Sequence, residues 1–287
     1  MNIGVLSSGN LGMDILTKLI KNRNISFVMT DSNSNEIVNF CNTSNIPLFK
    51  GNPRNGAALD FLSDKRCDVL LSVNYLFLID DELINFPFKY AINIHGSLLP
   101  KYRGRTPHVW AIINGETKTG ISAHLIDASC DTGDIIEQIE IDIDYEDTGA
   151  NILDKFKELY GPLIEKVLTD IERNQLRCFP QDHDKATFFG KRTPEDGKID
   201  WNWKKEQIRN WVRAQAYPYP GAFTYMNNVK ITIDKVSFCN EGFDSRIPNG
   251  TVLTLEPFKV KTANGIILID SVREKLDNIF DSQIILK

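Results

Sequence analysis

The fold is decided by the stretch AINIHGSLLPKYRGR (residues 91–105) and by the later stretch HLIDASCDTGDII (residues 124–136). The apolar start of the first stretch predicts a buried strand, in which Asn93 and His95 share one face because strand side chains alternate. A buried amide and imidazole each require a hydrogen-bond partner or a chemical task. Asp131, in a glycine-flanked loop, is the expected third member of this group.

These three residue types suit acyl transfer to an amine. The amide of Asn93 and the imidazole of His95 can hold a developing oxyanion, and the Asp131 carboxylate can orient the imidazole and take up a proton. This chemistry requires no metal ion. The sequence therefore predicts a catalytic trio at the end of the 91–95 strand.

The segment before the trio reads as a nucleotide-binding unit. A strand at Ile3–Leu6 is followed by a Gly-containing turn, a helix and a second strand that ends at Asp31. Ser7 stands where the dinucleotide fingerprint has its first glycine, so a turn needed only for packing is an equally good interpretation. As an alternative, Ser8 and Gly9 can offer backbone donors to a phosphate or sugar.

Alternating strands and helices predict an α/β fold with a Rossmann-like, doubly wound and mostly parallel sheet over residues 1–184. Ligands bind such sheets at the carboxyl ends of the strands, where Asn93 and His95 lie. Residues 185–287 contain several short strands with turns between them, which predicts a smaller C-terminal β-barrel of the OB type.

The composition argues against a nucleic-acid-binding, a membrane-spanning and a disulfide-rich protein. The net charge of −5 divides into −9 for residues 1–184 and +4 for residues 185–287, with no run of basic residues, so nucleic acid is not an expected partner. No apolar run is long enough to span a membrane. Five scattered cysteines without a C-x-x-C pair fit a reducing cytoplasm, and neither a zinc site nor a disulfide framework is expected.

The two stretches resemble 10-formyltetrahydrofolate-dependent formyltransferases. The resemblance rests on NIHGSLLPKYRG (residues 93–104) and DASCDTGDII (residues 127–136), and it extends over nearly the whole chain. The segment WVRAQAYPYPGAFTY (residues 211–225) is similar to the start of the family's C-terminal barrel domain. Two motifs of this length are far more specific than a single glycine-rich loop.

The resemblance implies a mechanism and a folate co-substrate, 10-formyltetrahydrofolate. Asn93 and His95 would stabilise the oxyanion, and Asp131 would hold His95 and accept the proton of the amine. The folate pterin would lie against two segments, and Arg105 would lie near the folate tail. The residues of these segments are Phe77, Leu78 and Ile79, and Asp127, Ala128, Ser129 and Cys130.

The resemblance also bears on the acceptor. Members that formylate amino sugars on nucleotide carriers share the block FGKRTPEDGKIDW (residues 189–201). We therefore expect a dTDP- or UDP-linked 3- or 4-amino deoxysugar as acceptor, as in lipopolysaccharide O-antigen biosynthesis. The candidate residues for holding this acceptor are Ser8, Gly9, Arg103 and Tyr219.

Three other functions remain open from the sequence. Methionyl-tRNA formyltransferases resemble both domains, but they usually carry a basic insertion where residues 30–50 contain only Lys50. A formyltetrahydrofolate hydrolase would pass the formyl group to water. A non-catalytic dinucleotide-binding module would rest on the turn at Ser8 and on Asp31. The sequence leaves the possibility of a homodimer open.

Overall fold

The computed structural model describes residues 1–275 and 284–287. The chain forms two compact units, which are described separately. The first unit comprises Met1–Gly104, Gly120–Ile141 and Lys155–Phe189, and the second comprises Arg105–Thr119, Asp142–Asp154 and Gly190–Lys287. Two segments that precede residue 184 therefore cluster with the C-terminal part of the chain.

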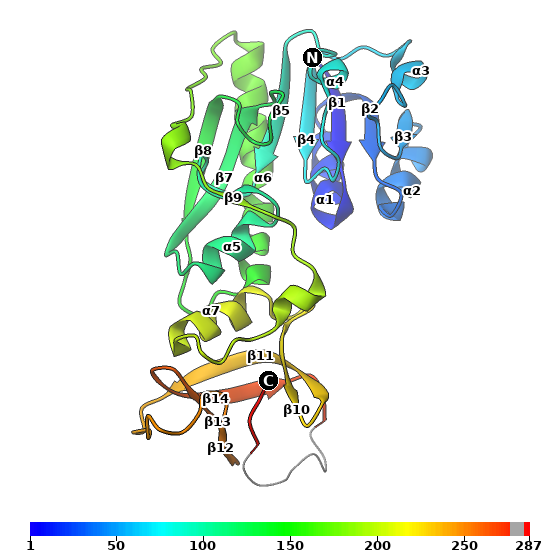
Figure 1. Ribbon diagram of the computed structural model, residues 1–287. Coiled ribbons are helices and arrows are strands. Elements are labelled where there is room, and N and C mark those ends of the chain that lie inside the picture. Colours follow the sequence, from blue (N-terminus) through cyan, green and yellow to red (C-terminus); the bar gives the residue numbers. More distant parts are fainter. Residues whose placement is uncertain (276–283) are drawn as a thin grey trace. The chain divides into compact units, whose positions relative to one another are not determined.

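A seven-stranded sheet forms the centre of the first unit, in the order β3-β2-β1-β4-β5-β7-β8 (Figure 1). The strands are β1 (Asn2–Ser7), β2 (Asn24–Thr30), β3 (Leu48–Lys50), β4 (Val69–Val73), β5 (Tyr90–His95), β7 (Lys118–Leu125) and β8 (Ile135–Asp142). The strands from β3 to β5 pair in parallel, which confirms the predicted α/β fold. In contrast, β7 pairs antiparallel to β5.

Helices and two short strands complete the two units. The helices are α1 (Gly9–Leu19), α2 (Asn35–Thr43), α3 (Leu59–Leu62), α4 (Asp81–Ile84), α5 (Pro107–Ile113), α6 (Gly149–Glu172) and α7 (Lys205–Ala214), with 3₁₀ helices at His183–Lys185 and Pro194–Gly197. Two short strands, β6 (Arg103–Gly104) and β9 (Phe188–Phe189), pair in parallel. No helix in the two described ranges combines the length and the apolar character that crossing a bilayer requires.

The core of the first unit centres on the Phe27 ring, which is fully buried. This ring makes edge-to-face contacts with Phe61 and Phe86, at 5.9 and 5.8 Å between ring centroids. It also covers Gly4 of β1 so closely that a Cβ atom there would collide with it. The apolar strand β1 thus requires glycine at position 4 in order to pack against β2.

The second unit contains a five-stranded antiparallel sheet, in the order β10-β11-β14-β13-β12. Its strands are β10 (Ala222–Met226), β11 (Val229–Cys239), β12 (Val252–Leu255), β13 (Phe258–Thr262) and β14 (Gly265–Val272). The buried Trp201 packs on this sheet and donates its indole N–H to Thr224 Oγ1 at 3.0 Å. The predicted small β domain is therefore confirmed as an antiparallel half-barrel.

Substitution of Gly4 tests the packing between β1 and Phe27. We expect Gly4→Ala to lower the free energy of unfolding by about 1–3 kcal/mol, because the added methyl group overpacks a full core. Gly161→Ala in α6 is the matched control, since its nearest new neighbour is the flexible Lys18 side chain at 3.9 Å. This control should be neutral or stabilising, by up to about 1 kcal/mol. Equal denaturation curves for wild type and Gly4→Ala would contradict the packing argument.

Candidate active site

The predicted trio meets at the carboxyl end of β5, within the first unit. His95 Nδ1 lies 3.5 Å from Asp131 Oδ2. Asn93 Nδ2 lies 3.5 Å from the other carboxylate oxygen, Oδ1. Asn93 and His95 share one face of the strand, and the loop after β7 carries Asp131 back to them. Both side chains thus approach the Asp131 carboxylate at the end of the sheet where ligands bind.

The Asp131 carboxylate is held tightly by its surroundings. Its Oδ2 accepts a hydrogen bond from the Gly104 backbone N–H at 2.9 Å, and its own backbone adopts a left-handed φ of 56°. Burial alone would raise the pKa of Asp131, but His95, His124 and the Gly104 N–H together lower it well below its usual range. Asp131 is therefore a charged carboxylate at neutral pH, in a conformation that costs an aspartate some strain.

The His95 imidazole is neutral and has a defined tautomer. Its Nε2 lies 2.8 Å from the Tyr102 carbonyl oxygen, and since a carbonyl only accepts, Nε2 carries the proton. The nitrogen that faces Asp131 is therefore the unprotonated Nδ1. Burial lowers the pKa of His95, although the nearby Asp131 charge opposes this effect. An imidazole in this state can accept a proton on Nδ1 and be stabilised by the adjacent carboxylate.

A fourth polar residue, His124, belongs to this group, although the sequence assigns no role to it. It lies on β7 directly opposite Asn93, and it is buried. Its Nδ1 donates to the Leu125 carbonyl oxygen at 2.8 Å, so its Nε2 is free to accept from Asn93 Nδ2 at 3.1 Å. His124 thereby fixes the orientation of the Asn93 amide. It opens the second motif, but only the pairing of β5 with β7 shows which residue it contacts.

The two segments expected to contact folate follow the two strands that neighbour β5. Residues 77–79 lie in the loop between β4 and α4, where Phe77 and Ile79 are half-buried and Leu78 is 57% exposed. The residues from Asp127 to Cys130 are exposed in the loop after β7, where Asp127 Oδ1 accepts from Ser129 N and Thr132 Oγ1. The loop after β4 leaves at the carboxyl end of β5, whereas the loop after the antiparallel β7 leaves at the level of Ile92 and returns to the trio through Asp131. The exposed Arg105 directly follows Gly104 in the chain.

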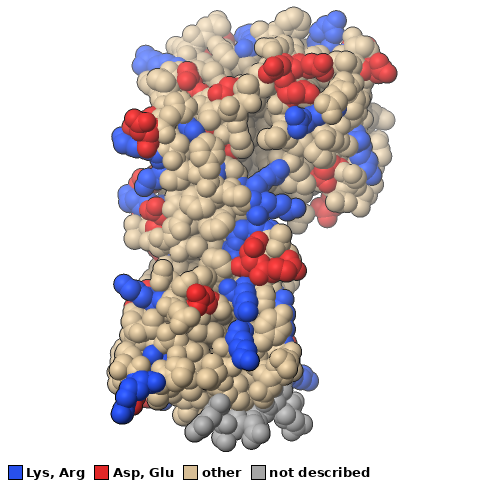
Figure 2. All heavy atoms as spheres, in the orientation of Figure 1, with Lys and Arg blue, Asp and Glu red and all other residues tan. Residues whose placement is uncertain are grey.

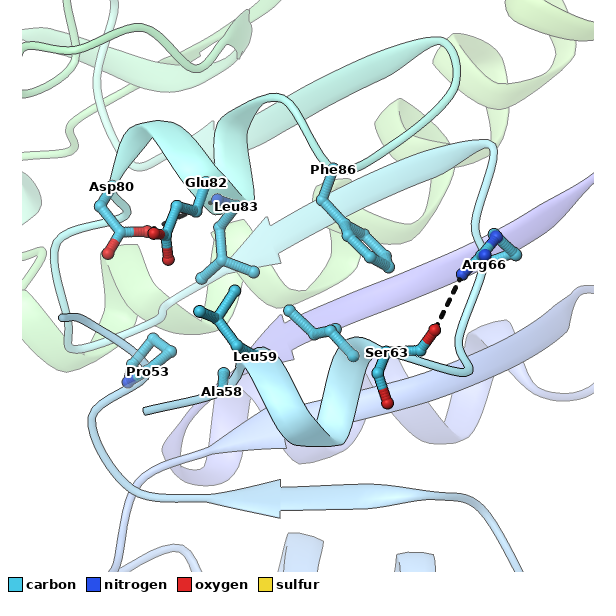
Figure 3. Close-up of a pocket in the computed structure, with 10 residues that line it drawn as sticks. Pro53, Ala58, Leu59, Ser63, Arg66, Asp80, Glu82, Leu83 and Phe86 are labelled. Carbon is cyan, nitrogen blue, oxygen red and sulfur yellow. Dashed lines mark hydrogen bonds between the residues drawn. The ribbon is translucent and has the colours of Figure 1, made fainter. Parts of the chain in front are cut away.

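An apolar groove lies between α3 and α4, next to the segment expected to contact folate. Its volume is about 270 Å³, and Leu59 from α3 and Leu83 from α4 point toward one another across it (Figure 3). Asp80 lies toward one end, and Arg66, which donates to the Ser63 carbonyl oxygen, lies at the other. None of the trio lines this groove, so it is separate from the candidate active site.

Ser8 and Gly9, two candidates for holding the acceptor, line a polar pocket of about 440 Å³ at the carboxyl ends of β1 and β2. The Gly9 N–H donates to Ser34 Oγ at 2.8 Å, and this hydroxyl donates to Asp31 Oδ2 at 2.5 Å. The pocket is lined by Asp31 and Glu36 but by no lysine or arginine. This geometry favours hydroxyl groups over phosphates, because a phosphate would compete with Ser34 and face two carboxylates.

The other two acceptor candidates have internal partners. Arg103 is 2% exposed, and its guanidinium donates to Gln181 Oε1 and to His183 Nδ1. In the second unit, the Tyr219 hydroxyl lies 2.8 Å from Nε2 of the buried His108. Burial raises the pKa of Tyr219 to about 12 and lowers the pKa of His108 to about 4. Within the described part of the chain, no three His, Cys, Asp or Glu side chains gather as a metal site would need.

A titration of His95 tests the electrostatics of the trio. We expect Asp131→Asn to lower the pKa of His95 further, because the carboxylate is the main group that raises it against the effects of burial, His124 and Arg103. The measurement is the pH dependence of the imidazole ¹⁵N chemical shifts in wild type and variant. A pKa that stays the same or rises in Asp131→Asn would show that the carboxylate does not act on His95.

The buried His108 predicts an acid-sensitive second unit. The unfolded chain takes up a proton near a pKa of 6.5 and the folded chain only near about 4, so stability falls as the pH drops through this window. The loss approaches about 3 kcal/mol below the lower value. We expect His108→Gln, which stays neutral and can still bond to Tyr219, to flatten the pH dependence of the free energy of unfolding. An unchanged slope would contradict this assignment.

Comparisons with known proteins identify the family of the chain. Residues 7–168 match the family model "Formyl transferase", and residues 191–286 match "Formyl transferase, C-terminal domain". The chain is similar to WlaRD, a sugar 3N-formyl transferase solved with dTDP and 5-N-formyl-THF, at 22% identity and a TM-score of 0.68 over 96% of this chain and 99% of that one.

Two further solved structures have the same fold. The N-formyltransferase from Helicobacter canadensis, in complex with folinic acid and dTDP-3-aminofucose, has 21% identity and a TM-score of 0.69 over 93% of this chain and 98% of that one. A 4-N formyltransferase from Francisella tularensis has 22% identity and a TM-score of 0.61 over 76% of this chain and 88% of that one. The family predicted from the two motifs is confirmed, and the chain belongs to the formyl transferase family.

Proposed function

We propose that this protein transfers the formyl group of 10-formyltetrahydrofolate to the amine of a nucleotide-linked amino deoxysugar. The observation that carries the proposal is the meeting of a charged Asp131, a neutral His95 and an oriented Asn93 at one point of the sheet edge. Structural relatives solved with formylated folates and dTDP or a dTDP-amino sugar support the choice of substrates.

Each residue of the trio has a distinct part in this reaction. Asn93 offers an amide hydrogen to the oxyanion, since its contact with Asp131 at 3.5 Å is too long to be a strong hydrogen bond. His95, rather than Asp131 as the resemblance implies, accepts the proton of the attacking amine on its unprotonated Nδ1 and returns it to the leaving folate nitrogen, because the lowered pKa of Asp131 makes that carboxylate a weak base. Asp131 stabilises the imidazolium that forms between these two transfers, because its low pKa keeps it charged.

The proposal assigns the substrates to the loops around the trio. Folate lies between residues 77–79 and residues 127–130, with its tail toward Arg105. The acceptor sugar nucleotide uses the polar pocket at Ser8 and Gly9, whose oxygen-rich lining suits hydroxyl groups. The internal partners of Arg103 and of the Tyr219 hydroxyl favour an indirect role for both residues.

The substrate class indicates the pathway and the compartment in which the protein would act. A product of this kind would serve lipopolysaccharide O-antigen biosynthesis, and the reaction would take place in the cytoplasm, in agreement with five free cysteines. Transfer to charged initiator tRNA is the second candidate. Figure 2 shows both acidic and basic side chains on the face in view, with several basic ones gathered near its middle. Residues 30–50, where the tRNA enzymes usually carry a basic insertion, contain a single basic residue, Lys50. The lack of basic residues in this segment favours the sugar nucleotide over the RNA.

Formyl transfer by wild type and by variants of the trio tests the proposal. The protein is incubated with 10-formyltetrahydrofolate and dTDP-, UDP- and GDP-linked amino sugars, and the formylated product is identified by mass spectrometry. We expect Asn93→Ala and His95→Ala each to lower kcat by about 10²–10³, because each removes a group that stabilises the transition state. Circular dichroism spectra show whether the variants remain folded.

Parallel incubations separate the other functions. Formylation of charged initiator tRNA without transfer to any nucleotide sugar would overturn the proposed acceptor. Release of formate at full rate without an amine would indicate a hydrolase. Tight NAD binding in calorimetry, with no formyl transfer, would indicate a dinucleotide-binding module.

A further inference from the structure

Gln181 is a buried amide at the back of the Asp131 loop. It lies between α6 and the 3₁₀ helix at His183–Lys185, outside both matched family regions, residues 7–168 and 191–286. Only 5% of the residue is exposed. A buried amide with four hydrogen-bonding positions requires partners for each of them. The identity of these partners shows what the side chain does.

All four positions of the Gln181 amide are used. Its Nε2 donates to the backbone carbonyl oxygens of Asp131 and Gly133, at 3.0 and 2.7 Å. Its Oε1 accepts from Nε and Nη2 of Arg103, at 3.2 and 2.6 Å. One side chain therefore binds the backbone on both sides of Thr132 and also binds a buried guanidinium.

These contacts form a closed ring with the Asp131 carboxylate. Gln181 holds the backbone of Asp131 and the side chain of Arg103. The next residue along the chain, Gly104, donates its N–H to Asp131 Oδ2 at 2.9 Å. The backbone and the carboxylate of Asp131 are thus fixed from two directions. This double hold explains how an aspartate keeps a left-handed φ of 56° beside His95.

The segment after Gln181 contacts the Tyr102–Gly104 part of the same ring. β9 pairs with β6 at Arg103 and Gly104, and the Arg103 N–H donates to the Thr187 carbonyl oxygen at 2.9 Å. The Phe189 ring stacks on Tyr102, whose carbonyl oxygen binds His95 Nε2. Residues 181–189 therefore contact Tyr102 and Gly104, the two residues whose carbonyl oxygen and N–H orient His95 and Asp131.

We infer that Gln181 is a positioning residue for formyl transfer, acting through the Asp131 loop and in concert with Arg103. This inference rests on the proposed function. Gln181 touches neither substrate. Its two N–H donors set the distance between Asp131 and His95, and its oxygen holds the buried guanidinium beside Gly104. The pairing of Arg103 with a neutral amide leaves the Asp131 charge available to the imidazole, because the guanidinium has no carboxylate partner of its own in the described residues.

Two substitutions of Gln181 test its N–H donors and its carbonyl acceptor. Gln181→Met has a similar length but removes all four hydrogen bonds. Gln181→Glu keeps acceptors for Arg103 and removes the two donors to the Asp131 loop. We expect both variants to lower kcat by about 10²-fold, because a small displacement of the carboxylate disturbs the geometry of proton transfer. KM for the sugar nucleotide should stay unchanged, since the pocket at Ser8 and Gly9 is not altered.

The His95 titration reports on positioning independently of turnover. The titratable and charged groups that act on His95 are Asp131, His124 and Arg103. We expect the pKa of His95 in Gln181→Met to fall toward its value in Asp131→Asn, since the carboxylate moves away from the ring. Arg23→Met is the stability control. It removes ion pairs with Glu165 and Glu172, at the amino end of β2, and should lower Tm without changing kcat or the His95 titration.

The outcomes distinguish the inference from the proposed function. Wild-type kcat and an unchanged His95 titration in Gln181→Met, with only Tm lowered, would show that Gln181 is merely structural and would leave formyl transfer intact. Absence of formyl transfer in wild type would refute the proposed function. In that case the His95 titration still decides whether Gln181 positions Asp131.

Discussion

The structure depends on one buried negative charge, the carboxylate of Asp131. A carboxylate in a low-dielectric environment is costly unless hydrogen bonds and nearby dipoles compensate it. Here the Gly104 N–H bonds to one oxygen, while His95 and His124 lie at 3.5 and 3.6 Å. The Gly104 N–H therefore stabilises the charge, and neither imidazole neutralises it, because the nitrogens that face it, His95 Nδ1 and His124 Nε2, carry no proton. A carboxylate held in this way can stabilise the imidazolium that forms when His95 takes up a proton.

The sheet is built so that these partners converge. β5 ends at His95 in the parallel part of the sheet, and the antiparallel β7 places His124 opposite Asn93. The loop after β7 then returns Asp131 to the same edge. The register of the antiparallel pair sets His124 across from Asn93, and the loop that joins β7 to β8 carries Asp131 to both histidines. The antiparallel pair is thus a requirement of the site.

Polar residues elsewhere show why isolated residue types are weak guides to ligand contacts. Arg103 and Tyr219 stand beside motif residues in the sequence, and the sequence predicts that they hold the acceptor. In the structure their polar groups bind Gln181 and His108, which lie 78 and 111 positions away along the chain. The partner of a polar side chain is set by tertiary contacts, which no local pattern specifies. For the same reason, the sequence does not predict that Ser34 Oγ accepts a hydrogen bond from the Gly9 N–H.

The sequence by itself determined the alternation of strands and helices, the small β domain, the trio and the family, because hydrophobic periodicity and motif spacing are local properties. Only the tertiary structure decided that β7 runs antiparallel, that His124 orients Asn93, and that the unprotonated Nδ1 of His95 faces Asp131. It also brought Gln181 behind the Asp131 loop. These features arise from pairing between distant segments, and buried hydrogen-bond donors and acceptors find their partners only when the whole unit has folded.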